Sequence, residues 1–301
     1  MPDRAEGPPH SRPPRDPGPK AGPAAASMGA PLRAANPASP PEREDPSLVA
    51  LIAGGTMDAE LAALVWLLVE SGMPLVVAAP PARLQAAGQL LRGVLGSIPA
   101  PSVNPPASAA GASHGADAAA PAAGVEAAAG VETAAGVETA AEPLDRLGAW
   151  QLVHGGRRGA VMAAESLEAL RTVLSRAPFL LSPQELTFLG GVLVLAPPTG
   201  QPAGRLRVTV AHYVRPLARD AGGHSQELPP AVLATWDETG SRYEHFAWGV
   251  IPEIAARLGR RTGDLEADLH HRRDDLAGLA AAGVTSLEEV RRLIAGYRVS
   301  Y

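Results

Sequence analysis

The sequence predicts an α/β fold with short buried strands, intervening helices and a helical C-terminal region. Two apolar runs of strand length, 74–78 and 190–196, lie next to stretches with helical periodicity. From residue 252 the pattern is helical to the end of the chain. The chain has 301 residues, of which 46% are hydrophobic, so it is long enough for one or two domains.

The first half contains a helix, a strand and a second helix. Asp58 is placed to cap a helix over 59–70, whose apolar residues occur nearly all round, so we expect this helix to be well buried. The apolar run 74–78 predicts a strand, and 87–95 predicts a helix after a loop over 79–86.

In the second half, 144–158 is expected to form a helix before a strand that begins at Gly159. Ser166 starts another helix, and 190–196 forms a strand. Residues 205–215 alternate, which places four side chains on one face: Leu206, Val208, Val210 and His212. The runs 231–237 and 242–248 flank a turn and predict a hairpin.

The C-terminal region predicts further helices, with Ser286 and Glu289 forming a capping box for 287–297. Adjacent histidines 270 and 271 point apart on a helix, so no metal site is expected. Their charged neighbours are interpreted as a solvated face: Asp268, Arg272, Arg273, Asp274 and Asp275. Three tryptophans in apolar runs are expected in the core: Trp66, Trp236 and Trp248.

Two segments are expected to be disordered. Residues 1–46 hold 13 of the 31 prolines and cannot bury enough apolar area to offset their ordering entropy. Residues 100–143 form an Ala/Gly/Pro linker with a six-residue repeat that starts at Gly124, Gly130 and Gly136. The predicted organisation is therefore a tail (1–46), two parts of one core (47–99 and 144–250) and a helical segment (251–301).

Composition excludes several classes of protein. There are no cysteines, hence no disulfides or thiolate metal sites, and the net charge of −5 argues against nucleic acid as a partner. No apolar run approaches the ~18 residues of a membrane span, and the N-terminus lacks the apolar region of a secretory signal. We expect a cytoplasmic protein that does not span a membrane.

The loop over 79–86 lies between strand and helix, which is the context of a phosphate-binding P-loop, G-x-x-x-x-G-K-[ST]. Its defining positions are occupied by Ala79, Leu84, Gln85 and Ala86. Leu84 hinders the backbone nest, Gln85 carries no charge for the phosphates, and Ala86 has no oxygen for magnesium. We therefore predict no cofactor-binding, metal-binding or catalytic residues, and an ordinary strand-to-helix turn is the alternative interpretation of the loop.

Ordered pieces flank this loop: Gly55-Thr56-Met57, the helix 59–70 with Trp66 and Glu70, Leu90-Leu91 and Ile98-Pro99. Further pieces are the string Met162-Ala163-Ala164-Glu165-Ser166, the segment 177–195 and the tail 272–297. Together they resemble the type II/type IV secretion-system ATPase superfamily, whose motors drive type II secretion, type IV pili and archaella. Ala163 stands where the histidine of that family's histidine box is expected.

The resemblance implies a reduced RecA-like P-loop NTPase core. The family's region between phosphate loop and histidine box holds an acidic box, catalytic arginines and the Walker B strand, and here that region is chiefly the linker. The implied function is a degenerate, non-hydrolysing motor homologue that acts as an accessory or regulatory subunit without ATP or magnesium.

The resemblance also implies partners and a location. The partners would be an intact secretion or pilus motor ATPase and its membrane platform, at the inner face of the membrane, with weak self-association. Two alternatives stay open: an NTPase whose catalytic groups are supplied in trans, and a relic interaction domain unrelated to a motor.

Overall fold

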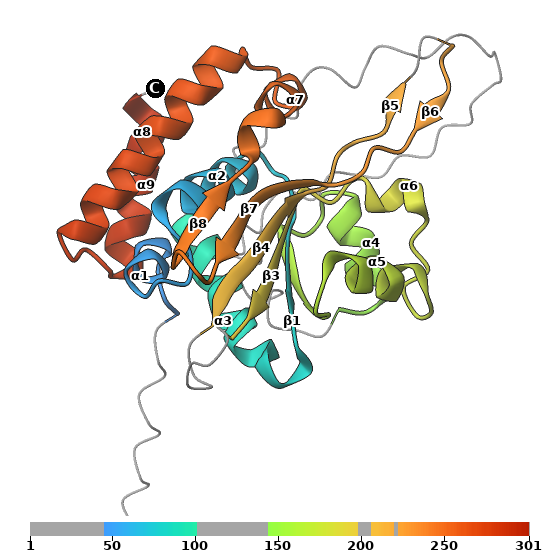
Figure 1. Ribbon diagram of the computed structural model, residues 1–301, viewed down its shortest axis with the longest axis horizontal. Coiled ribbons are helices and arrows are strands. Elements are labelled where there is room, and N and C mark those ends of the chain that lie inside the picture. The colour runs from blue at the N-terminus through green and yellow to red at the C-terminus, as the bar shows by residue number, and fades with distance from the viewer. Residues whose placement is uncertain (1–44, 101–143, 198–205, 220–221, 301) are drawn as a thin grey trace, which may run out of the picture. The chain divides into compact units, whose positions relative to one another are not determined.

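A six-stranded mixed sheet organises the part of the chain that the structure describes, in the order β2-β1-β3-β4-β7-β8 (Figure 1). The structure is a computed structural model and describes residues 45–100, 144–197, 206–219 and 222–300. Residues 101–143 of the predicted linker (100–143) and residues 1–44 of the predicted tail (1–46) lie outside the described residues.

Three strands form the parallel half of the sheet. β1 (Leu75–Ala79) lies between β2 (Gly159–Ala163) and β3 (Gly191–Ala196), parallel to both. Every residue of β1 is buried, because helices cover both faces of this half. A strand covered on both faces is apolar throughout instead of alternating, which explains the sequence of β1.

The antiparallel half continues from β3 through β4 (Arg207–Tyr213), β7 (Ala231–Asp237) and β8 (Arg242–His245). The predicted hairpin is thus present, with a shorter second strand. A separate two-stranded ribbon pairs β5 (Ala218–Arg219) with β6 (Ser225–Gln226).

A bulge in β4 overturns the predicted face of four residues. Val194 of β3 is opposite Val210, whereas the next residue, Leu195, is opposite Val208, so Thr209 is the extra residue. An extra residue reverses the alternation of a strand. Leu206 and Val208 accordingly lie in one core, while Val210 packs against the core on the other face.

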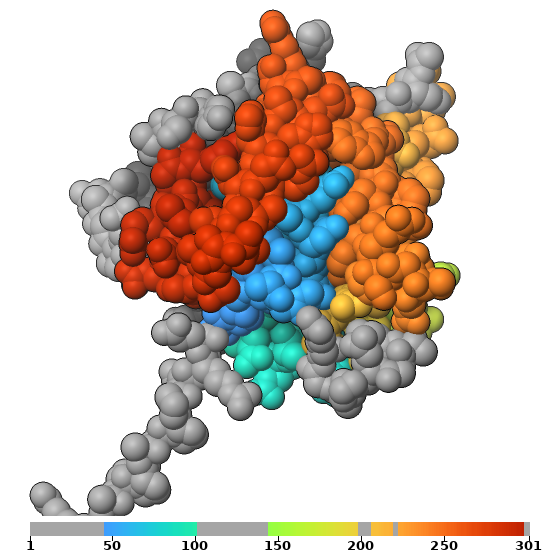
Figure 2. Space-filling view, turned by 60° about the vertical axis from the view of Figure 1, so that its left-hand side comes forward, coloured from blue at the N-terminus to red at the C-terminus, as the bar shows by residue number. Residues whose placement is uncertain are grey.

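Helices cover the two faces of the sheet in separate groups (Figure 1). The larger core combines Leu75 and Val77 of β1 with six helices: α1 (Leu48–Ala53), α2 (Ala59–Glu70), α3 (Leu84–Ser97), α7 (Ile251–Arg257), α8 (Thr262–Ala281) and α9 (Leu287–Ser300). The smaller core combines Val76 and Ala78 with α4 (Arg146–Val153), α5 (Leu167–Ser175) and α6 (Pro183–Leu186). In Figure 2, α1 and α2, in blue, lie between the C-terminal helices in red and the strands in orange.

Local capping explains where several helices begin. Asp58 Oδ1 accepts a hydrogen bond from the Leu61 N–H, and Ser166 Oγ accepts one from the Ala169 N–H, so both predicted N-caps are confirmed. The helix predicted over 144–158 is shorter in the structure and ends at Val153. None of the helices in the described ranges is long and apolar enough to cross a membrane.

Two predictions about the C-terminal region are wrong. Arg272 was expected on a solvated face but is only 5% exposed, because α8 packs against α2 and brings it to Glu70. Trp248 was expected in the core but is 46% exposed, whereas Trp66 is 2% exposed as predicted. Trp248 lies in a 3₁₀ turn after β8, η4 (Ala247–Gly249), where its ring contacts the His270 ring at the surface.

Candidate functional site

The carboxyl ends of the parallel strands are the place where open α/β sheets bind ligands. The structure brings two of the predicted site positions together there, since Ala79 at the end of β1 is the register partner of Ala163 at the end of β2. The Ala164 N–H donates to the Ala79 carbonyl oxygen over 3.0 Å. These two positions, singled out by the sequence resemblance, are therefore neighbours, and both side chains are only a methyl group.

The turn that follows β1 has few backbone donors to offer an anion. It consists of Pro80 and a 3₁₀ helix, η1 (Pro81–Arg83), which leads directly into α3. The two prolines have no N–H, the Arg83 N–H donates to the Pro80 carbonyl oxygen, and the Leu84 N–H donates to that of Pro81. Four of the five residues 80–84, all except residue 82, thus have no free N–H for a phosphate.

The other predicted positions lie in the first turn of α3, which begins at Leu84 instead of the predicted residue 87. Proline at the start of η1 favours this early helical turn. Gln85 is exposed, and Ala86 packs against the larger core. These residues do not fit a magnesium nucleotide, because they offer neither a cation for the phosphates nor an oxygen for the metal.

A cluster of charged and aromatic side chains, which sequence reasoning missed, joins α2, α8 and α9. Arg272 forms an ion pair with Glu70 and a second one with Asp268, Nε to Oδ1, over 2.8 Å. Its guanidinium carbon lies 4.4 Å from the centroid of the Trp66 ring and 5.1 Å from that of Tyr297. The Arg272 cluster, as we call these five residues, holds the C-terminal helices against α2.

The Arg272 cluster keeps its charges in spite of burial. Burial alone would raise the pKa of Asp268, but hydrogen bonds donated by Arg272, Arg260 and Tyr297 lower it. Both partners of the central pair are therefore ionised at neutral pH. In the sequence, the spacing of four residues between Asp268 and Arg272 indicates that the two side chains can pair on one helix. It does not indicate that Glu70 of α2 forms the second ion pair with Arg272.

A histidine–carboxylate pair links the β7–β8 hairpin to the start of α2. His245 Nε2 lies 2.8 Å from Asp58 Oδ2, and His245 Nδ1 lies 3.8 Å from Glu60 Oε1. Burial lowers the pKa of His245, but the hydrogen bond to Asp58 and the charges of Asp58 and Glu60 outweigh it, so the pKa is raised. Asp58 Oδ1 also accepts the Leu61 N–H, so the pair ties the hairpin to the first turn of α2.

We expect the stabilising effect of His245 to depend on pH. Because its folded-state pKa is raised, its contribution is fully present below the unfolded-state pKa of about 6.5 and is lost as the pH rises through the folded-state value. The loss of stability in His245→Gln should therefore be larger at about pH 5.5 than at about pH 8.5. Urea unfolding at both pH values measures this difference.

His212→Gln provides a control of opposite sign. Burial lowers the pKa of His212, so the wild-type protein loses stability from this residue as the pH falls. The unfolding free energy of the wild type relative to His212→Gln should be smaller at the acidic pH. Equal effects of His245→Gln at the two pH values would contradict the raised pKa.

His212 also lines a cleft of about 730 Å³ along one side of α5. The charges around the cleft are balanced. Arg171 forms an ion pair with Glu227, and the cleft is also lined by one acidic residue, Glu168, and one basic residue, Arg176. Among the described residues, no group of three or more His, Asp or Glu side chains is arranged to hold a metal ion. The cleft therefore favours no particular charge of ligand.

No family model and no curated protein matches the chain. The resemblance to secretion ATPases therefore depends on the residues quoted for it.

Proposed function

We propose that this protein is a degenerate, non-hydrolysing relative of the secretion and pilus motor ATPases that works as an accessory or regulatory subunit. One observation carries the proposal. The turn after β1 and the end of β2 have the strand-to-helix arrangement of a phosphate-binding edge, yet Ala79 and Ala163 meet there without a charged or hydroxyl group.

The arrangement of the parallel strands is what supports a reduced RecA-like core in this proposal. β1 is the middle one of the three parallel strands, α3 follows it after the 3₁₀ turn η1, and the string that contains Ala163 ends the neighbouring strand. A motif that has lost every side chain needed for phosphate and magnesium, while its strand and helix stay packed, is typical of a domain kept for its surfaces.

The proposed partner is an intact motor ATPase of a secretion or pilus machine. Ring motors of that family build their subunit contacts around the nucleotide, so a subunit without phosphate contacts has less to hold it to copies of itself. Incorporation beside an intact subunit would use the partner's own nucleotide and apolar contacts. Weak self-association and mixed assembly are therefore expected together.

We expect calorimetry with Mg·ATP to give no binding of micromolar affinity for the protein alone, because Gln85 and Ala86 supply neither charge nor ligand. With an intact motor encoded nearby, the two proteins should form a complex that binds ATP only in proportion to the motor. The variant Gln85→Lys with Ala86→Thr should not gain hydrolysis, since the prolines of the turn remain.

Micromolar Mg·ATP affinity of the protein alone would contradict the expected loss of phosphate binding, and ATP turnover by the protein alone would reject the non-hydrolysing assignment. If the proteins do not associate in the ultracentrifuge, and the motor's ATP turnover is unchanged by the addition, the accessory role is rejected even though the first result holds.

A further inference from the structure

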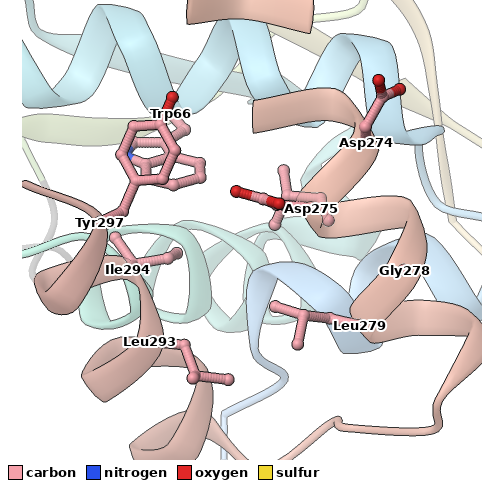
Figure 3. A pocket seen from close by; sticks show the side chains of 9 residues that line it. Trp66, Asp274, Asp275, Gly278, Leu279, Leu293, Ile294 and Tyr297 are labelled. Atoms are coloured by element: carbon pink, nitrogen blue, oxygen red, sulfur yellow. The ribbon is translucent and has the colours of Figure 1, made fainter. Parts of the chain in front are cut away.

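A groove of about 470 Å³ lies between α8 and α9, with a residue of α2 at its base (Figure 3). Trp66 of α2 lines it together with Leu276 and Leu279 of α8 and Ile294 and Tyr297 of α9. Small-molecule sites typically enclose about 300–1,000 Å³ and are mostly apolar, with a few polar groups that orient the ligand. The size and lining of this groove therefore match a small organic ligand.

Apolar surface is left open at the mouth of the groove. Leu293 of α9 lines it and is 45% exposed, although Ile294 beside it is buried. Gly278 of α8 also lines it, and a Cβ built there would meet no atom within 4 Å. A glycine inside a helix costs about 1 kcal/mol relative to alanine, and this one leaves open space beside the groove.

One carboxylate faces this apolar space, that of the solvent-exposed residue Asp275. Asp274 and Asp275 both line the groove, but the Asp274 carboxylate is paired with Arg273 over 2.8 Å. In Figure 3 the Asp275 carboxylate points toward Trp66 and Tyr297, whereas the Asp274 carboxylate points away from them. Within the described ranges, Asp275 makes no hydrogen bond or ion pair.

The nearby guanidinium of Arg272 does not satisfy Asp275, because its charge is already matched by Glu70 and Asp268. Arg260 also pairs with Asp268, so these four groups are together neutral, and Asp275 supplies the uncompensated negative charge at the groove. The groove therefore combines an aromatic and aliphatic lining with a net negative potential, which favours a cation over an anion or a neutral ligand.

We propose that the groove between α8 and α9 binds a small organic cation, namely a primary ammonium group on a short aryl or alkyl body. The ammonium group donates its hydrogen bonds to the Asp275 carboxylate, and the apolar body lies against Trp66, Leu279 and Leu293. This site is independent of the degenerate phosphate-loop edge and does not require the proposed link to a motor.

The test is titration of the full chain with 3-phenylpropylammonium, followed by calorimetry and by NMR of the tryptophan indole signals. Binding should be saturable with a Kd in the millimolar range or tighter, as expected for a ligand of this size. The neutral analogue 3-phenylpropanol should bind about threefold to fivefold more weakly, because it cannot form an ion pair with the exposed Asp275 carboxylate.

Two pairs of variants distinguish the site from general surface binding. Asp275→Asn should weaken binding about threefold to fivefold, while Asp274→Asn, which removes an already paired charge, should change it less than about twofold. Gly278→Leu should fill the groove and abolish binding. Gly263→Leu, in the same helix and also with no atom within 4 Å of its Cβ, should leave binding unchanged.

The proposal is overturned if the ammonium probe shows no saturable binding up to about 10 mM, a concentration above the dissociation constant expected for a ligand of its size. It is equally overturned if phenylpropanol binds as well as the ammonium probe, or if Asp275→Asn binds like the wild type. Retained binding in Gly278→Leu, with an unchanged thermal melt, would place the ligand elsewhere on the surface.

Discussion

Replacing Arg272 with methionine is expected to lower the free energy of unfolding by about 3 kcal/mol, at the lower end of the range for breaking a buried ion pair. The change leaves Glu70 and Asp268 largely buried without their cation, and it removes the guanidinium from the faces of Trp66 and Tyr297. Asp268 keeps hydrogen bonds from Arg260 and Tyr297, which limits the cost. Urea unfolding measures the loss, and the melting temperature should fall by about 6–12 °C.

The neighbouring residue provides a matched control for this prediction. Arg273 carries the same side chain in the same helix, but its ion pair with Asp274 is exposed, with 36% and 66% of the two side chains accessible. Exposed pairs contribute about 0–1 kcal/mol, so Arg273→Met should have a small effect. Similar losses in the two variants would show that the Arg272 cluster does not hold α8 against α2.

Truncating Trp66 to alanine is expected to destabilise the protein by about 3–5 kcal/mol, as measured by chemical unfolding. The Trp66 ring is 2% exposed and packs edge-on against Tyr297 with 5.0 Å between ring centroids. Its removal leaves a cavity where α2, α8 and α9 meet. It also removes the aromatic face above which the Arg272 guanidinium lies.

Trp248→Ala is the corresponding control, because it deletes the same side chain from a position that is 46% exposed. Its contact with the His270 ring is a surface contact, so we expect a loss below about 1 kcal/mol. If Trp248→Ala were as destabilising as Trp66→Ala, the exposed position of Trp248 in the fold would be incorrect.

Much of the α/β architecture could be predicted because it follows from local patterns. Helix 59–70 has the same bounds in the structure, since the Asp58 cap and the run of apolar residues are both local signals. The strands 75–79 and 191–196 were predicted within a residue, and the start of the strand at Gly159 was predicted, because short apolar runs between polar or glycine-containing segments specify buried strands.

Errors arose where one local pattern competes with another. The bulge at Thr209 adds a residue to β4. No residue type in this stretch predicts a bulge, so the face predicted for the side chains of 206–212 was wrong. The start of α3 was predicted at residue 87 but lies at Leu84. Residues 79–86 were predicted to form a loop, whereas Pro81 already begins a helical turn.

For the candidate site, the sequence alone determined which groups are missing at positions 79, 84–86 and 163, because the chemistry of a side chain is fixed by its identity. Only the tertiary structure decided which groups meet: Ala79 with Ala163 across two strands, and Arg272 with Glu70 across two helices. The two arginines 272 and 273 are equivalent in the sequence, yet one is buried and the other is exposed. Burial and long-range pairing depend on how distant elements pack, and a single sequence carries no local signal for that packing.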